Sequence, residues 1–134
     1  MGIKSPVKCA GYRVGDSEEI KFGNIKIDVI DTPGHTKDSI SLVCNNIILT
    51  GDALFLDDGG AGRDDLPGGD PSEHWESLQK FRKQKGDLIV HPAHDYRNRE
   101  PSSLSNQIKT NPHFKPESKN VKVLKDGMIG WNKV

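Results

Sequence analysis

The sequence predicts a layered α/β domain in which short strands come first and helices follow. The first half contains short apolar runs bounded by turn residues, and a helix pattern with a clear start follows at Asp70. The length of 134 residues suits one compact domain. Leu, Ile, Val and Phe account for 32 of these residues, which is above the level of disordered chains but low for a self-sufficient core.

Four strands are expected in the first half of the chain, joined in pairs by tight turns. They cover Glu18–Phe22, Ile25–Ile30, Ser39–Val43 and Ile47–Thr50. In the second of them, Ile25, Ile27 and Val29 alternate with charged residues, which is typical of a strand with one buried face. The dipeptides Gly23-Asn24 and Asn45-Asn46 favour turns because Gly and Asn tolerate positive φ.

A helix is expected to begin after Asp70, which is a suitable N-cap, with Pro71 at the first helical position and Gly86 as the stop. Its apolar stripe consists of Trp75, Leu78 and Phe81. The remaining expected elements are a buried strand at Asp87–Val90, a helix from Ser102 or Ser103 to about Lys109 that ends at Asn111-Pro112, and a strand at Val121–Leu124.

The segment from Asp57 to Asp70 has no hydrophobic period and is too long for an ordinary connection, so it is expected to be functional or mobile. Its aspartates are interpreted as a solvated cluster. On the helix that follows, His74 is interpreted as a solvated residue rather than a ligand.

Charge and composition exclude several classes of function. The formal net charge is zero, which provides no bulk attraction to nucleic acid or to an anionic membrane. No apolar run approaches the roughly 20 residues of a membrane-spanning helix, and Met1–Ala10 has no secretory apolar segment. Cys9 and Cys44 do not make a disulfide framework. We therefore expect a cytoplasmic protein with no nucleic-acid or membrane partner.

Three polar residues each lie just beyond the end of an expected strand: His35, Asp52 and His94. Strand ends that meet at one edge of a sheet are where α/β folds bind ligands. Two imidazoles and a carboxylate suit zinc, iron or manganese, and a carboxylate can bridge two metals. Taken singly, each residue is equally well explained as a surface histidine or a turn-forming aspartate.

Five motifs occur in the order found in the metallo-β-lactamase superfamily. They are Thr32-Pro-Gly-His35-Thr36, Thr50-Gly-Asp52, Gly62-Arg63-Asp64-Asp65-Leu66, His91-Pro-Ala-His94-Asp95-Tyr96 and Asn111-Pro112. The chain most resembles the glyoxalase II-like branch of that superfamily, and within it the persulfide dioxygenases. The resemblance implies an αββα sandwich, of which this chain would form the C-terminal half, with a mixed sheet and helices on one face.

The resemblance also implies a site and a chemistry. His35 and Asp52 would bind the first metal, with Asp52 also catalytic, and His94 would bind a second metal in the hydrolases. In the persulfide dioxygenases only one iron is bound. The cofactor would be one or two Fe(II) or Zn ions, and the substrate a small thiol, persulfide or thioester. Arg63, Asp64 and Tyr96 would line the substrate pocket.

One family motif is absent, because no pair among the five histidines has the spacing of H-x-H-x-D-H. In the family that motif lies upstream of the TPGHT segment. We therefore expect residues 1–114 to be a partial domain that is either an enzyme or a non-catalytic half-domain, completed by a second copy or by an N-terminal half. The tail, residues 115–134, faintly resembles the closing segment of rhodanese domains, although an ordinary amphipathic strand and turn explains it equally well.

Overall fold

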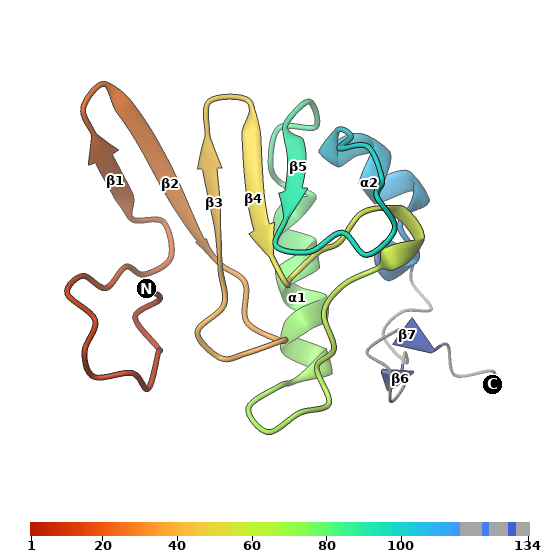
Figure 1. Cartoon of the computed structure of the whole chain (residues 1–134), viewed down its shortest axis with the longest axis horizontal. Helices are drawn as coiled ribbons and strands as arrows, with labels where there is room; N and C mark the ends of the chain where they lie inside the picture. The colour runs from red at the N-terminus through yellow and green to blue at the C-terminus, as the bar shows by residue number, and fades with distance from the viewer. Residues whose placement is uncertain (116–121, 124–128, 131–134) are drawn as a thin grey trace.

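The computed structural model describes residues 1–115, 122–123 and 129–130. Five strands form one mixed sheet in chain order (Figure 1). They are β1 (Glu19–Phe22), β2 (Ile25–Asp31), β3 (Ile40–Cys44), β4 (Ile47–Gly51) and β5 (Ile89–Pro92). The first four are antiparallel neighbours, and β5 runs parallel to β4. The mixed sheet and the α/β class expected from the sequence are thereby confirmed.

The helical elements are η1 (Asp57–Gly59), α1 (Pro71–Phe81), α2 (Leu104–Thr110) and η2 (Pro112–Phe114). Asp70 caps α1 as expected, because its side chain accepts from the backbone N–H groups of Ser72 and Glu73. The helix ends at Phe81 and not near Gly86. Lys83 N–H and Gln84 N–H bond to carbonyls three residues back, which tightens the last turn, while Gly86 lies against α2 through its carbonyl.

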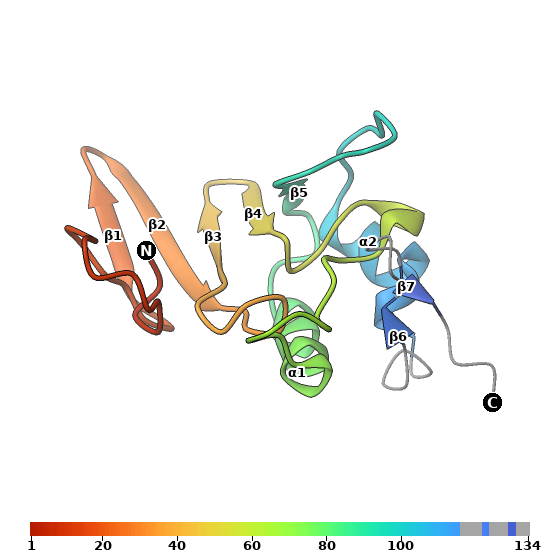
Figure 2. The same ribbon diagram turned by 60° about the horizontal axis from the view of Figure 1, so that its bottom comes forward.

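The hydrophobic core lies between α1 and one face of the sheet, and Figure 2 shows α1 on that side. Ile30, Ile48 and Val90 come from the strands and Leu78 and Phe81 from α1. Leu104 of α2 and Phe114 of η2 belong to the same core, so the helical elements share one face as expected. Trp75, expected in the apolar stripe, is only half-buried.

The opposite face of the sheet is apolar but largely uncovered. Cross-strand pairs place the following apolar side chains on this face: Ile20, Phe22, Ile25, Ile27, Val29, Leu42, Cys44, Ile47, Leu49 and Ile89. All but buried Val29 are exposed or half-buried, with Phe22 at 72% and Leu49 at 45% relative exposure. We call these ten residues the open face.

The β1–β2 hairpin has its charged residues on the other side. Lys26 Nζ lies 2.9 Å from Glu19 Oε2 and 3.7 Å from Asp28 Oδ1. The open face is therefore the only apolar face of this hairpin, since α1 does not cover its charged side.

Two short strands, β6 (Lys122–Val123) and β7 (Ile129–Gly130), pair with each other. The strand expected at Val121–Leu124 lies partly outside the described residues, as does most of the rhodanese-like tail, which stays a prediction. Both cysteines are free. Within the described residues, no helix has the length and apolar character needed to cross a membrane.

Candidate metal centre

His35 is held by a turn that leaves β2 and is rigid at both ends. Thr32 is fully buried, donates its N–H to the carbonyl of Ser39, and its hydroxyl lies 3.1 Å from that of Ser41. Gly34 has φ +144°, and a Cβ at that position would overlap the Cβ of His74. Only glycine fits there. The turn therefore fixes the backbone directly before His35.

Asp52 sits where β4 turns into the following loop. Ala53 N–H donates to Thr50 O, and Thr50 Oγ1 donates to Leu54 O. Gly62 packs against this turn, and its N–H donates to Asp52 O at 2.8 Å. A Cβ on Gly62 would lie 2.6 Å from Asp52 O and 2.9 Å from His35 Nδ1. The absence of a side chain at Gly62 thus allows these two residues to approach each other.

His94 follows β5 and is tied to the β4 turn, because Ala93 N–H donates to Gly51 O at 3.0 Å. Its ring stacks on Tyr96 with a centroid distance of 5.5 Å and contacts Phe55 edge-on at 6.1 Å. Tyr96 itself is 78% exposed. The parallel pairing of β4 and β5 therefore brings Asp52 and His94 to the same edge of the sheet.

The three residues converge on the Asp52 carboxylate. His35 Nε2 lies 3.4 Å from Asp52 Oδ2, and His94 Nε2 lies 3.3 Å from Asp52 Oδ1. Both separations exceed the usual 2.7–3.2 Å of an N–H···O hydrogen bond. Asp52 Oδ1 is buried and accepts no hydrogen bond. Each carboxylate oxygen thus faces one imidazole nitrogen across a gap.

The protonation of His35 explains that gap. Its Nδ1 lies 2.5 Å from Arg63 O, and because a carbonyl only accepts, Nδ1 carries the proton. In the neutral ring, Nε2 then presents a lone pair to a carboxylate oxygen, and two acceptors facing each other require a cation or a proton between them. A tetrahedral ion with bonds of about 2.0–2.1 Å has ligand–ligand edges of about 3.3 Å. The donor set therefore fits a zinc- or iron-like cation.

The donor set is nevertheless incomplete. Among the described residues, no group of three or more His, Cys, Asp or Glu side chains is arranged to hold a metal ion by itself. His35, Asp52 and His94 fit as part of a ligand set that requires further ligands. Their assignment as metal ligands stays a prediction.

The three residues expected in the substrate pocket differ in burial and in the direction of their side chains. Arg63 reaches the site with its carbonyl, while its guanidinium binds Asp65 through Nε at 2.7 Å and Nη2 at 2.8 Å. Asp64 is buried and turns toward α1, where its Oδ2 lies 3.0 Å from His74 Nδ1. Tyr96 is exposed beside His94. Whether these three contact a substrate stays a prediction.

His74 is the residue whose environment the sequence analysis mistook. It is 2% exposed and not solvated, and its Nε2 lies 2.8 Å from Ala53 O. A signal was present in the sequence, because His74, Leu78 and Phe81 are spaced i, i+4, i+7 and so share the buried face of α1.

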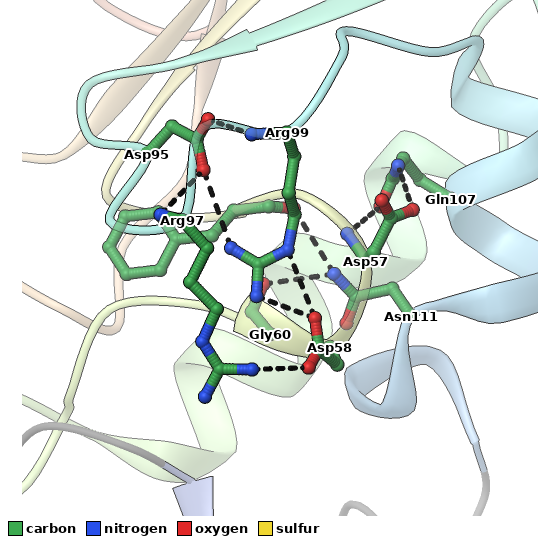
Figure 3. Close-up of polar contacts among 9 residues, drawn as sticks. Asp57, Asp58, Gly60, Asp95, Arg97, Arg99, Gln107 and Asn111 are labelled. Atoms are coloured by element: carbon green, nitrogen blue, oxygen red, sulfur yellow. Dashed lines mark hydrogen bonds and ion pairs between the residues drawn. The ribbon is translucent and has the colours of Figure 1, made fainter.

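The loop after Asp52 is anchored at its start, as Figure 3 shows. Asn111 Nδ2 donates to Phe55 O and Gly60 O, and Gln107 exchanges two hydrogen bonds with Asp57. Asp57 is thus not part of a solvated cluster, and neither is buried Asp64, which corrects that interpretation for both residues. The contacts join α2 to the loop beside the candidate centre.

Asp58 of the same loop binds two arginines from the segment that follows His94. Its Oδ2 accepts from Arg97 at 2.7 Å and its Oδ1 from Arg99 Nε at 3.0 Å (Figure 3). The hydrogen bond from Arg99 holds the pKa of Asp58 below its usual value. Asp95 accepts from the backbone N–H groups of Arg97 and Arg99. The loops bearing Asp52 and His94 are thereby joined.

Residues 12–94 match the family model of the metallo-beta-lactamase superfamily. The chain belongs to the metallo-β-lactamase superfamily. Persulfide dioxygenase ETHE1 of Homo sapiens is 31% identical over 108 residues, which are 78% of this chain and 42% of that protein. Hydroxyacylglutathione hydrolase of Idiomarina loihiensis is 37% identical over 97 residues, 72% of this chain and 37% of that protein.

Solved metallo-β-lactamase structures agree with this membership. The crystal structure of ETHE1 from Myxococcus xanthus has a TM-score of 0.76 and 34% identity, covering 83% of this chain and 49% of that one. A di-iron-bound protein, TTHA1623, has a TM-score of 0.57 and 31% identity, covering 64% and 41%. The chain thus spans less than half the length of these relatives.

Proposed function

We propose that this chain supplies the Asp52 side of the metal centre of an enzyme that acts on a glutathione-type thiol derivative. The observation that carries the proposal is the Asp52 carboxylate, whose buried Oδ1 accepts no hydrogen bond and whose two oxygens face His35 and His94. His35, Asp52 and His94 would hold the metal, which when bound supplies Lewis acidity and, for iron, the binding of dioxygen.

Persulfide oxidation is the first candidate reaction. The similarity to ETHE1 proteins in both sequence and structure supports it. The terminal sulfur of a glutathione-type persulfide would take up both atoms of dioxygen and, with one water, leave as sulfite while the thiol is regenerated. In this reaction Arg63 O orients the His35 ring through Nδ1–H, which directs Nε2 toward the metal position.

Thioester hydrolysis is the second candidate, and the position of His94 favours it. His94 lies 3.3 Å from one oxygen of Asp52 and His35 lies 3.4 Å from the other, so His94 and His35 would each hold an ion together with Asp52, and two ions would supply an activated water. Water would be added across the thioester to give a carboxylic acid and a thiol. Tyr96, which is exposed and stacked on His94, would contact the thiol part of the substrate.

Metal analysis tests the proposal directly. We expect the purified chain to bind iron, zinc or manganese, and His35→Ala to lower the affinity by at least about 100-fold, the upper end of the range for the loss of a supporting residue. The matched control is His91→Ala, because His91 is also a half-buried histidine, in β5. Two assays separate the candidate reactions. Oxygen uptake with glutathione persulfide indicates persulfide oxidation, and thiol release from a thioester indicates hydrolysis. Equal metal content in wild type and His35→Ala contradicts the proposal.

We also propose that a further β-layer, from the same polypeptide, a second copy or another chain, covers the open face and completes the ligand set. The apolar side chains of the open face and the incomplete ligand set favour this alternative. Sedimentation equilibrium tests it. Self-association that is lost in Leu49→Glu but kept in Lys21→Glu, on the charged side of the hairpin, would indicate a second copy. Strictly monomeric behaviour at high concentration, with cooperative unfolding, would exclude a second copy as the covering layer.

A further inference from the structure

A second histidine–aspartate pair lies beneath the candidate metal centre, enclosed by protein. His74 on α1 and Asp64 in the preceding loop are 2% and 6% exposed. Their facing atoms, Nδ1 and Oδ2, are 3.0 Å apart, and His74 Nε2 lies 2.8 Å from Ala53 O. Buried polar groups of this kind are stable only when hydrogen bonds inside the protein replace those to water.

The contacts of His74 determine where its protons are. Ala53 O only accepts, so Nε2 carries a proton and donates it. A neutral ring facing an ionised Asp64 would set two acceptors 3.0 Å apart, so one further proton is shared between Nδ1 and Oδ2. The pair is neutral overall, either as imidazolium and carboxylate or as imidazole and carboxylic acid.

The ring of His113 completes the enclosure. It contacts His74 edge-on at a centroid distance of 5.4 Å. Burial holds the pKa of His113 well below its usual value. His113 is therefore uncharged near neutral pH and does not compete with His74 for the carboxylate of Asp64.

Three segments of the candidate centre meet at His74. Its Cβ packs on Gly34, the residue before His35. Its Nε2–H holds Ala53, the residue after Asp52. Its Nδ1 lies 3.0 Å from Oδ2 of Asp64. Asp64 directly follows Arg63, whose carbonyl oxygen accepts the hydrogen bond from His35 Nδ1. One buried ring on a rigid helix thus contacts the segments that carry His35, Asp52 and the hydrogen-bond partner of His35.

We propose that His74, paired with Asp64, is a positioning residue that holds the His35 turn and the Asp52 turn against each other. The pair touches neither His35 nor Asp52 and acts through Gly34, Ala53 and Arg63. It sets the direction of His35 Nε2 and its separation from the Asp52 carboxylate. The role of the pair in metal binding rests on the proposed function, whereas the geometry that it sets does not.

The test compares His74→Leu with His74→Gln and with Ser77→Ala. Ser77 is the matched control because it is also buried on α1 and its Oγ donates to Pro33 O at 2.6 Å, on the same turn but away from Ala53 and Asp64. The measurement is the ¹⁵N NMR spectrum of the His35 ring in metal-free protein. Its chemical shifts report which nitrogen carries the proton.

We expect Nδ1 of His35 to carry a proton in wild type and Ser77→Ala, whether or not Nε2 is also protonated, and His74→Leu to show a mixture of tautomers. His74→Gln keeps an N–H for Ala53 O and is expected to be intermediate. Zinc affinity should fall by about 10- to 100-fold in His74→Leu, the usual range for residues that support metal ligands. It should change little in Ser77→Ala.

Retention of the Nδ1–H form in His74→Leu overturns the proposal, as does its absence from wild type. If His74→Leu does not fold, a His35 spectrum of His74→Gln that is identical to wild type overturns the proposal, and an intermediate spectrum supports it. A wild-type chain that binds no metal contradicts the proposed function, whereas the His35 spectrum still decides whether His74 positions that ring. The two failures are therefore distinguishable.

Discussion

The chain contains two histidine–aspartate groups of the same residue types that differ in exposure and in the distance between imidazole and carboxylate. At the sheet edge, the side chains of His35, Asp52 and His94 are 24%, 28% and 49% exposed, and one carboxylate oxygen accepts no hydrogen bond. In the second group, Asp64 and His74 are buried and His74 Nδ1 lies 3.0 Å from Asp64 Oδ2, within hydrogen-bond distance, while Asp64 Oδ1, like Asp52 Oδ1, accepts no hydrogen bond. The imidazoles of the first group lie beyond that distance from their carboxylate, whereas the imidazole of the second bonds to its carboxylate directly. The two groups contain the same residue types. Their different geometry is therefore what distinguishes the candidate metal ligands from the buried pair Asp64–His74.

The largest expected effect is on stability. His74→Leu leaves Asp64 buried without its partner, which should lower the free energy of unfolding by about 3–5 kcal/mol. In the double variant His74→Leu/Asp64→Leu, part of that loss should be recovered because no charge remains buried. Urea unfolding of the four proteins measures this. If the loss of unfolding free energy in the double variant equals the sum of the losses in the two single variants, His74 and Asp64 do not stabilise each other. The pair would then not differ in this respect from the residues of the candidate metal centre.

The next effect separates binding from stability at Asp52. Asp52→Asn should weaken binding of Zn²⁺ by about 100-fold, which corresponds to about 2.7 kcal/mol. The free energy of unfolding should stay within about 0.5 kcal/mol of wild type or rise, because the substitution removes a carboxylate that has one buried oxygen with no hydrogen bond. Isothermal titration and urea unfolding measure the two quantities. Asp28→Asn, on the charged side of the hairpin, is the control, and a large loss of stability in Asp52→Asn would make this group structural.

The smallest expected effect is on the pH dependence of the free energy of unfolding, through the buried ring of His113. Burial lowers the pKa of His113 in the folded protein, so below about pH 6.5 the unfolded chain binds a proton that the folded chain does not. Stability is therefore full above pH 6.5 and falls by about 1.4 kcal/mol per pH unit as the pH drops toward the folded pKa. His113→Phe should flatten this slope in urea unfolding between pH 7.5 and 5. An unchanged slope would mean that His113 is protonated in the folded state.

The features that the sequence predicted well depend on neighbouring residues. The turns at Gly23 and Asn45 have positive φ, of 59° and 53°, and Asp70 caps α1 through residues two and three positions away. The strand bounds differ from expectation by one or two residues. The three candidate ligands could be proposed together because each directly follows a strand.

The features that were missed depend on partners distant in sequence. The burial of His74 results from Asp64 and Ala53, ten and 21 residues away. The anchoring of Asp57 results from Gln107, 50 residues away. No local pattern contains these contacts, because they arise only when α1 and α2 pack on the sheet. The helical spacing of His74 with Leu78 and Phe81 was the one local indication.

The order of the strands has a consequence for how the protein assembles. β1 to β4 pair with their neighbours in sequence, whereas β5 reaches β4 only after the chain has crossed the loop and α1. Local hairpins close quickly, and distant pairings close slowly because more chain must be ordered first. We therefore expect His35 and Asp52 to come together in an early folding step and His94 to arrive in a late one. A nascent chain released before β5 would hold the carboxylate and one imidazole but not the other.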